Sequence, residues 1–275
     1  MKKRIVFCLF IVVILLINGC ENTTEYNYEP QLTVNGELKA GFPIDSISLT
    51  WSTRINERYD TPDQLASEAD VRINGLTLDE YSDYKGYYYY PDTNYRAQSG
   101  QTYRLEVYLG DEHLFSETTV PAAFQMTPLG ISEGDTVQYV PGVSWFSDEF
   151  FNIVWPGYSG SLIYRILSMA EDDRPENFIE DDRPEAEVFK GEVEDRINPG
   201  IWWVADEYVR VNWMFFNWTG WHQIVVSAMD SNYYEYRNGI LFGEQGGQNF
   251  NQIVEGGLGL FSSSASDTIR IYLVE

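Results

Sequence analysis

Apolar and polar residues alternate along the first half of the chain in short runs separated by turn residues. Alternation at period two, with β-branched and aromatic residues among the apolar ones, is typical of strands with one buried face. The pattern predicts strands over residues 32–34, 46–51, 71–73, 87–90, 103–108 and 114–120. A hairpin turn is expected at 109–112, and 61–69 is the one stretch that favours a helix. This density of strands indicates an immunoglobulin-like or transthyretin-like β-sandwich over residues 31–121.

The second half begins at a boundary marked by Pro121 and Pro128. Its alternation predicts strands over residues 150–155, 162–168, 209–218, 223–229, 258–262 and 269–274. Residues 230–238 open with Asp-Ser and close before a glycine, which are start and stop signals of a short helix. We therefore expect a mainly all-β protein. Its β-sandwich at 31–121 is followed by a second, mostly β domain at 122–275 with one short helix.

The first 19 residues differ from the rest, with a basic head, an apolar run over 5–17 and a Gly-Cys pair at the end. These are the parts of a bacterial export signal, here with the cut placed before Cys20. The alternative is a membrane-spanning anchor, but such an anchor needs about 18 or more apolar residues, and this run is shorter. We predict a lipoprotein signal peptide at 1–19, lipid on Cys20 and a polar tether over 20–30.

Charge narrows the classes of partner. The chain has 42 acidic and 18 basic residues, a net charge of −24, and three of the cations lie in the signal. Such a field repels nucleic acids, which we exclude as partners. A hydrophobic content of 44% argues for a packed core rather than a disordered acidic chain. Both cysteines, Cys8 and Cys20, are removed or lipidated, so the mature chain would have no thiol for a disulfide or a thiolate metal site.

An acidic hexapeptide occurs twice, at 171–176 and 180–185. Its central carboxylates are hard oxygen ligands of the kind that calcium prefers. However, no glycine stands at an EF-hand spacing, and an arginine interrupts each copy. We favour a solvated acidic loop, able to dock on a basic surface, over a calcium site, and we expect no other cofactor. The candidate residues for cation binding or docking are Asp172, Asp173, Asp181 and Asp182.

Tryptophans are concentrated between residues 201 and 221. Exposed rings on a β-surface stack against sugars, whereas buried rings belong to the core. Val209, Val211 and Trp213 alternate with polar residues, so we assign most of this stretch to a half-buried strand. Trp202, Trp203 and Trp218 do not fit this alternation, and they are the candidates for an exposed ligand or partner patch.

Sequence motifs of catalysis are lacking. No serine stands in a Gly-x-Ser-x-Gly elbow, and no His-Glu-x-x-His helix is present. His113 and His222 are interpreted as structural or exposed residues. Pairs of carboxylates could hydrolyse glycosides, but among 42 acidic residues such pairs arise by chance. The glycine-rich stretch 256–259 is interpreted as a tight turn or bulge with close backbone packing, and no catalytic residue is assigned.

The C-terminal third carries a resemblance to a known family. Its residues 224–236 read IVVSAMDSNYYEY and are followed by GGQNF at 246–250 and by IVEGGLGLF at 253–261. This order resembles the Bacteroidota lipoprotein family known as domain of unknown function 4249. The first half is similar in style, with LTVNG at 32–36 and GQTY at 100–103. The resemblance implies an outer-membrane lipoprotein that is often associated with TonB-dependent transporters, and it brings no catalytic residues.

Three hypotheses on function follow. The first is a non-catalytic accessory or binding module, lipid-anchored in the outer membrane at the cell surface and associated with a TonB-dependent β-barrel transporter. The second is a glycan-binding surface lipoprotein that uses the exposed tryptophans. The third and weakest is an envelope hydrolase that uses two carboxylates in a cleft.

Overall fold

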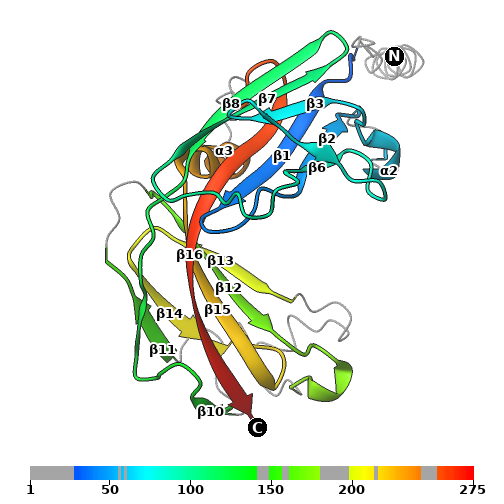
Figure 1. Cartoon of the computed structure of the whole chain (residues 1–275). Coiled ribbons are helices and arrows are strands. Elements are labelled where there is room, and N and C mark those ends of the chain that lie inside the picture. Colours follow the sequence, from blue (N-terminus) through cyan, green and yellow to red (C-terminus); the bar gives the residue numbers. More distant parts are fainter. Residues whose placement is uncertain are drawn as a thin grey trace, which may run out of the picture.

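The computed structural model describes residues 28–54, 57–58, 61–140, 149–156, 161–179, 198–213, 216–242 and 253–275. The expected all-β class is confirmed, because the described strands form three sheets and the longest helix, α3 (Ser231–Phe242), has 12 residues. Figure 1 shows two lobes that are joined along one long strand. Within the described residues, no helix is long and apolar enough to cross a membrane.

The first lobe is a sandwich built mainly from the first half of the chain. One layer contains β1 (Leu32–Lys39), β2 (Ile47–Trp51), β5 (Asp79–Glu80) and β6 (Tyr87–Tyr89). The other contains β3 (Asp70–Ile73), β4 (Leu76–Thr77), β7 (Thr102–Leu109) and β8 (Glu112–Thr119). Buried alternate residues such as Val34, Leu49, Leu105 and Leu114 fill the space between the layers. The hairpin between β7 and β8 is confirmed, whereas the predicted helix shrinks to α2 (Thr61–Gln64).

The second lobe is a sandwich of the remaining strands. Its larger layer contains β10 (Thr136–Gln138), β12 (Tyr164–Ala170), β13 (Gly200–Val204), β15 (Gly220–Met229) and part of β16 (Leu258–Val274). Its smaller layer contains β9 (Thr127–Leu129), β11 (Glu149–Val154) and β14 (Tyr208–Asn212). Ile166, Val226 and Ile271 of the larger layer form one core with Ile153 and Val211 of the smaller one. A short 3-10 helix, η1 (Pro175–Asn177), follows β12.

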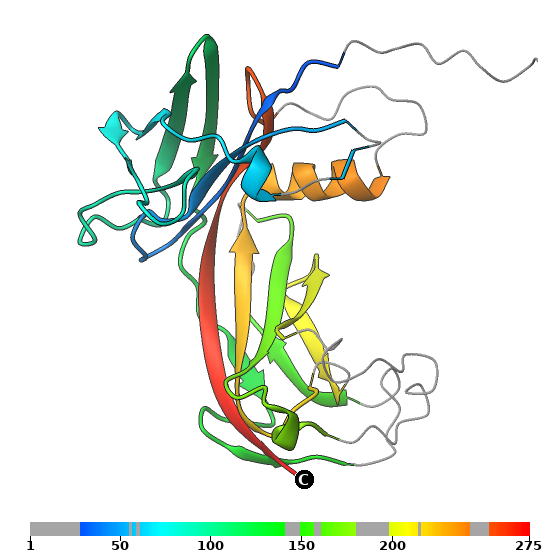
Figure 2. The ribbon, with the colours of Figure 1, turned by 90° about the vertical axis from the view of Figure 1, so that its right-hand side faces the viewer.

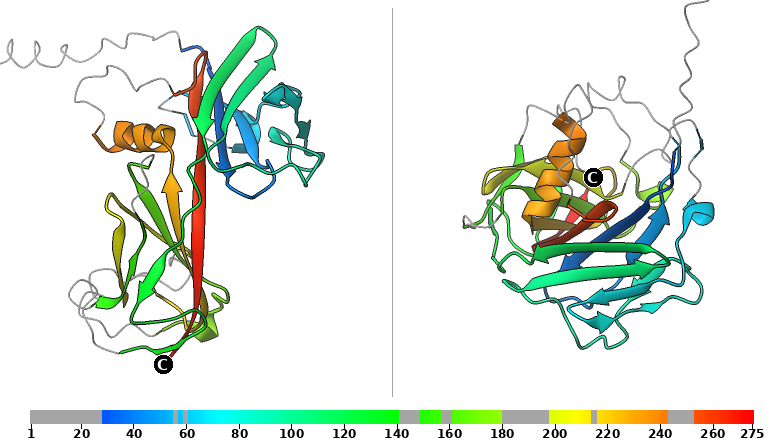
Figure 3. Two further views of the ribbon diagram at one scale, coloured as in Figure 1. Left: turned by 60° about the vertical axis from the view of Figure 1, so that its left-hand side comes forward. Right: turned by 90° about the horizontal axis from the view of Figure 1, so that it is seen from above.

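Strand β16 belongs to both lobes. Residues 258–264 pair in parallel with β1, and residues 264–273 pair antiparallel with β15, so Ser264 has a strand neighbour on each side. The two separate strands predicted at 258–262 and 269–274 are therefore one strand of 17 residues. Figure 3 shows β16 passing from the first sandwich into the second. The first sandwich is thus completed from outside residues 31–121.

The glycine-rich stretch before β16 is the predicted close-packed turn. Glu255 and Phe115 of β8 exchange backbone hydrogen bonds of 2.9 and 3.0 Å. A Cβ atom on Gly256 would collide with the His113 carbonyl oxygen, and one on Gly259 would collide with the Val34 carbonyl oxygen. Both glycines also have positive φ, which other residues adopt only with strain. The turn therefore fits between β8 and β1 only if residues 256 and 259 are glycines.

We expect Gly259→Ala to lower the free energy of unfolding by about 3–5 kcal/mol, because strain adds to the collision with Val34. Gly130→Ala is the matched control, since Gly130 also has positive φ but faces open space. Strain alone should cost the control about 1–2 kcal/mol. Urea unfolding followed by tryptophan fluorescence measures both values, and equal losses would contradict the close-packing account.

Candidate binding surface

The larger sheet of the second lobe has one face on the core and one face turned outward. Leu167 on β12 lies between Ile201 on β13 and Val225 on β15 in the strand register. Their neighbours Ile166, Trp202 and Val226 point to the core, so these three side chains point away from it. Ile201 is 45% exposed. The outer sheet face is the name used below for this aliphatic row and the residues that flank it.

Two arginine–tryptophan stacks flank the aliphatic row. On one side, the Arg237 guanidinium of α3 lies 4.8 Å from the centroid of the Trp203 ring, and Trp203 is 37% exposed. On the other side, the Arg270 guanidinium lies 3.9 Å from the Trp221 ring. Glu171 holds Arg270 in place, with an Nε–Oε1 distance of 2.7 Å. Stacked guanidinium groups keep their charge and present planar donors to solvent.

A bidentate ion pair joins the lobes on the same side of the sheet. Arg165 on β12 donates to both carboxylate oxygens of Glu37 on β1, at 2.9 and 2.8 Å. Ser264 of β16 adds a hydrogen bond of 2.6 Å to Glu37. Burial alone would raise the pKa of Glu37, but the hydrogen bonds and charge of Arg165 hold it below its ordinary value. The pair spans β15 and β16, where small residues such as Ser227 and Ser266 leave room for it.

Helix α3 begins at a buried polar cluster between the two layers of the first lobe. The Tyr233 backbone N–H donates to Asp230 Oδ1 at 3.0 Å, so Asp230 caps the helix. Thr118 of β8 donates to the other Asp230 oxygen and lies 2.6 Å from the Ser263 hydroxyl. Asn232 donates to the carbonyls of Glu117 and Phe261. The helix is therefore fixed to β8 and β16 at once. Figure 2 shows α3, in orange, at the level where the two lobes meet.

Helix α3 also reaches the outer sheet face. The Trp203 indole N–H donates to the Tyr233 hydroxyl at 3.0 Å. The Arg165 guanidinium lies 5.9 Å from the centroid of the Tyr233 ring. Glu37, Arg165, Tyr233, Trp203 and Arg237 thus form one continuous chain of contacts from the first lobe to the second. It connects the ion pair to the arginine–tryptophan stack.

The three candidate tryptophans do not form one patch, which corrects the prediction. Trp202 packs against the core of the second lobe, while Trp203 points the opposite way. Trp218 is buried and lies edge-on to Phe178, with ring centroids 6.0 Å apart. The predicted strand at 209–218 ends at Asn212, and the side chains of Phe216 and Trp218 are both buried. Only Trp203 remains on an accessible surface.

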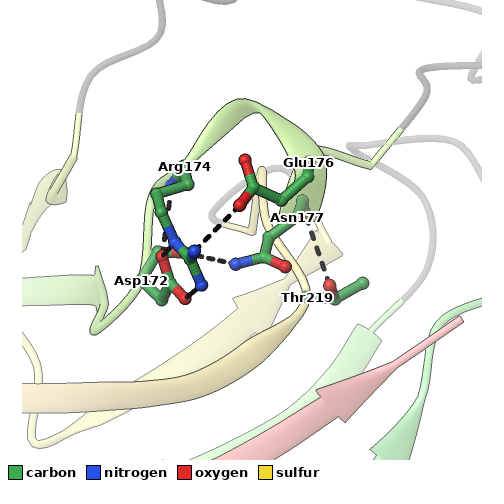
Figure 4. A network of polar contacts seen from close by, with 5 residues as sticks. All are labelled: Asp172, Arg174, Glu176, Asn177 and Thr219. Carbon is green, nitrogen blue, oxygen red and sulfur yellow. Dashed lines mark hydrogen bonds and ion pairs between the residues drawn. The ribbon is translucent and has the colours of Figure 1, made fainter.

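The first acidic repeat is a self-contained ionic network, shown in Figure 4. Arg174 donates to Asp172 with Nε at 2.6 Å and pairs with Glu176 at 2.9 Å. The Arg174 hydrogen bonds lower the pKa of Asp172 to about 2. Asp173 accepts a hydrogen bond of 3.0 Å from Asn198. The arginine thus occupies the position that a cation would need, and Asp181, Asp182 and Cys20 lie outside the described residues.

The described residues contain no group of three or more His, Cys, Asp and Glu side chains that could hold a metal. His222 is buried on β15, donates through Nδ1 to the Gly220 carbonyl at 3.1 Å and packs edge-on to Phe216. Burial lowers the pKa of His222 to about 4, so the ring is neutral at pH 7. Its environment is that of a core residue. His113 stacks on Tyr108, with ring centroids 4.4 Å apart.

The residues of the outer sheet face other than Trp203 were not found by sequence reasoning. Glu37 and Arg165 are 128 positions apart, and nothing in either segment indicates their pairing. A usable signal existed for α3, because Asp230, Asn232 and Tyr233 belong to the segment that carries the family resemblance. Their contacts show that this segment is the joint between the lobes.

We expect Glu37→Gln to lower the free energy of unfolding by about 2–3 kcal/mol, because it leaves Arg165 partly buried without its carboxylate. The double variant Glu37→Leu with Arg165→Met should recover most of this loss, since it removes both charges. As a control, Asp70→Asn breaks the solvent-exposed pair with Arg72 and should leave the free energy of unfolding almost unchanged. A double variant that is no more stable than Glu37→Gln in urea unfolding would contradict this account of the ion pair.

Two buried groups make opposite contributions to stability in mildly acidic solution. Burial raises the pKa of Asp230 to about 6, so its contribution is largest in acid and is lost as pH rises from 3.8 to 6. The folded pKa of His222 is below its ordinary 6.5, so its contribution is lost as pH falls from 6.5 to 4. Each amounts to about 3 kcal/mol, and the two largely cancel in the native chain.

Relative to the native chain, His222→Phe should therefore gain stability by about 3 kcal/mol as pH falls from 6.5 to 4. Asp230→Asn, which keeps an oxygen for the Tyr233 N–H, should gain a similar amount as pH rises from 4 to 6. Melting temperatures measured across this range test both slopes. Parallel curves for the native chain and both variants would show that neither group titrates as stated.

Comparison with known proteins gives one assignment. A search of curated proteins finds no match. A family model described as a domain of unknown function (DUF4249) matches residues 20–270, nearly the whole chain after the predicted signal. This agrees with the resemblance inferred from residues 224–261, and the description carries no catalytic activity. The chain belongs to the DUF4249 family.

Proposed function

We propose that this chain is a non-catalytic accessory lipoprotein, held in the outer membrane by lipid on Cys20 at the cell surface. Its outer sheet face docks on a TonB-dependent β-barrel transporter. The observation that carries the proposal is the aliphatic row of Ile201, Leu167 and Val225, flanked by two arginine–tryptophan stacks.

The composition of this face supports a protein partner. Aromatic residues and arginine are enriched at protein interfaces, and they supply most of the binding energy there. The aliphatic row provides area that is dehydrated on contact, while Arg237 and Arg270 lie at its margins. The residues stand on paired strands, so little conformational entropy is lost when the face is covered.

The charge of the face supports the same conclusion. The chain as a whole carries a net charge of −24, and most acidic surfaces would repel one another. Arg165 and Arg270 are paired with Glu37 and Glu171, and Arg237 adds a guanidinium group that stacks on Trp203. The stacked Arg237 guanidinium is therefore the charge that this face offers to an acidic group of the partner.

The other two hypotheses receive less support. The glycan-binding hypothesis requires exposed rings at three tryptophans. Trp202 packs against the core and Trp218 is buried, so neither ring is available to stack on a sugar. A carboxylate hydrolase needs an acid whose pKa is raised. Asp230 has a raised pKa, but it is buried as the cap of α3 and does not line the pocket described below. Glu37 lies at that pocket, but Arg165 lowers its pKa. These observations leave a docking function as the one that the geometry supports best.

The test is affinity purification of the tagged full chain from its native membrane, followed by mass spectrometry. The native chain should recover a β-barrel transporter in stoichiometric amount. Ile201→Asp should reduce this recovery by about tenfold or more, because it places a charge in the aliphatic row. Leu129→Asp is the matched control, since Leu129 on the opposite sheet is 46% exposed against 45% for Ile201, and it should leave recovery unchanged.

Two results would overturn parts of the proposal. If the native chain recovers no β-barrel, the accessory function is wrong. If Ile201→Asp recovers as much as the native chain, docking occurs elsewhere. A Cys20→Ala variant tests the anchor, because without lipid the chain should leave the membrane fraction.

A further inference from the structure

A second feature of the molecule lies at the β1–β2 hairpin of the first lobe. A pocket of about 380 Å³ opens there, lined by Asn35, Gly36, Glu37, Lys39, Phe42, Pro43, Asp45 and Ser46. This volume is in the range of sites that hold small molecules. The lining is contributed by β1 and by the loop that follows it. Except for Glu37, none of these residues takes part in the contacts described above.

The loop that forms the pocket is fixed on its far side. The Gly41 N–H donates to the Ala97 carbonyl at 2.7 Å, and the Ala97 N–H donates to the Phe42 carbonyl at 2.9 Å. Arg96 adds a hydrogen bond of 2.8 Å to the Gly41 carbonyl. The Tyr90 N–H donates to the Ile44 carbonyl at 3.0 Å. The backbone around Phe42 is thus held in one conformation, although its ring is 58% exposed.

The polar groups at the pocket have unused hydrogen-bonding capacity. Asp45 accepts the Tyr81 hydroxyl at 2.6 Å with Oδ1, and its Oδ2 has no partner among the described residues. Three further polar groups at the pocket make no side-chain hydrogen bond or ion pair with any described residue. They are the Lys39 ammonium, the Asn35 amide and the Ser46 hydroxyl. Glu37, in contrast, is occupied by Arg165 and Ser264. Donors and acceptors therefore stand side by side, next to one exposed aromatic ring.

This combination selects among classes of ligand. An inorganic or organic phosphate would meet the carboxylates of Asp45 and Glu37, and a metal ion would meet Lys39. A purely apolar ligand would leave Lys39 and Asp45 desolvated without partners. A hydroxyl group both donates and accepts, so it uses Asn35, Lys39 and Asp45 together. A sugar ring adds an apolar C–H face that packs on an aromatic ring such as Phe42.

We propose that this pocket binds a neutral saccharide, with the Phe42 ring against the sugar face and Asn35, Lys39 and Asp45 on its hydroxyl groups. The site differs from the tryptophan patch considered from the sequence, since it lies in the first lobe and contains no tryptophan. The inference goes beyond docking on a transporter and does not depend on it.

The test is titration calorimetry on the full chain, in a detergent without a sugar head group. The probes are maltotriose, cellotriose, mannotriose and triacetylchitotriose, with inorganic phosphate and glycylglycine as representatives of anionic and zwitterionic ligands. At least one trisaccharide should bind within the range tested, up to about 10 mM. Phe42→Ala and Asp45→Asn should each weaken that binding about tenfold. Leu162→Ala, at a residue 56% exposed in the second lobe, is the matched control and should bind as the native chain does.

Three results would overturn the proposal. The first is no heat with any saccharide, and the second is binding of phosphate or glycylglycine in place of the sugars. The third is saccharide binding that survives both Phe42→Ala and Asp45→Asn, which would place the sugar elsewhere. Unchanged melting temperatures check that the variants are folded. Recovery of the β-barrel by the same variants is measured in parallel, so failure of the saccharide site is distinguished from failure of docking.

Discussion

The backbone hydrogen bonding of β16 is the constraint on which the two-lobed structure depends. A strand of 17 residues must satisfy its polar groups along its whole length, and no single neighbour of β16 is that long. The chain meets this requirement with β1 on one edge of the first part and β15 on the other edge of the second part. Because each neighbour also belongs to a separate core, the sharing of β16 fuses two sandwiches into one body.

The crossing point between the cores is polar rather than apolar. Residues 262–266 of β16 are serine and alanine, and their hydroxyls bond to Glu37, Thr118 and Ser227. Buried polar groups of this kind add little net stability, but they are costly to leave unpaired. A shift of β16 by one residue would break these hydrogen bonds and reverse the faces of its core residues. The polar joint therefore fixes the register of β16 between the two cores. Hydrophobic burial alone would fix this register less specifically.

Sequence reasoning was most successful where a strand has one solvent-exposed face and one buried face. The alternation of β1, β7, β8 and β15 is plain, and so is the N-terminal cap of α3. The predicted stop before Gly239 is wrong, because α3 continues to Phe242. Sequence reasoning failed at residues 263–268 because serine, alanine and aspartate lack the bulk of strand formers. Their pairing with β1 or β15 overrides that preference. It failed at Trp218 because β14 ends at Asn212, so the alternation of this strand does not extend to Trp218. Contacts such as Glu37–Arg165 arise from topology, which local patterns do not encode.

The shared sheet also explains why the two candidate binding features lie on one side of the molecule. Both cores occupy the same face of this sheet, so the other face carries the arginine–tryptophan stacks and the side chains of Glu37 and Lys39. Glu37 lines the pocket and also holds Arg165, whose other contact is Tyr233 beside Trp203. The pocket therefore shares Glu37 with the continuous chain of contacts that ends in the outer sheet face. The joint between the lobes and the recognition surfaces are built from the same few side chains, and a substitution at Glu37 affects both.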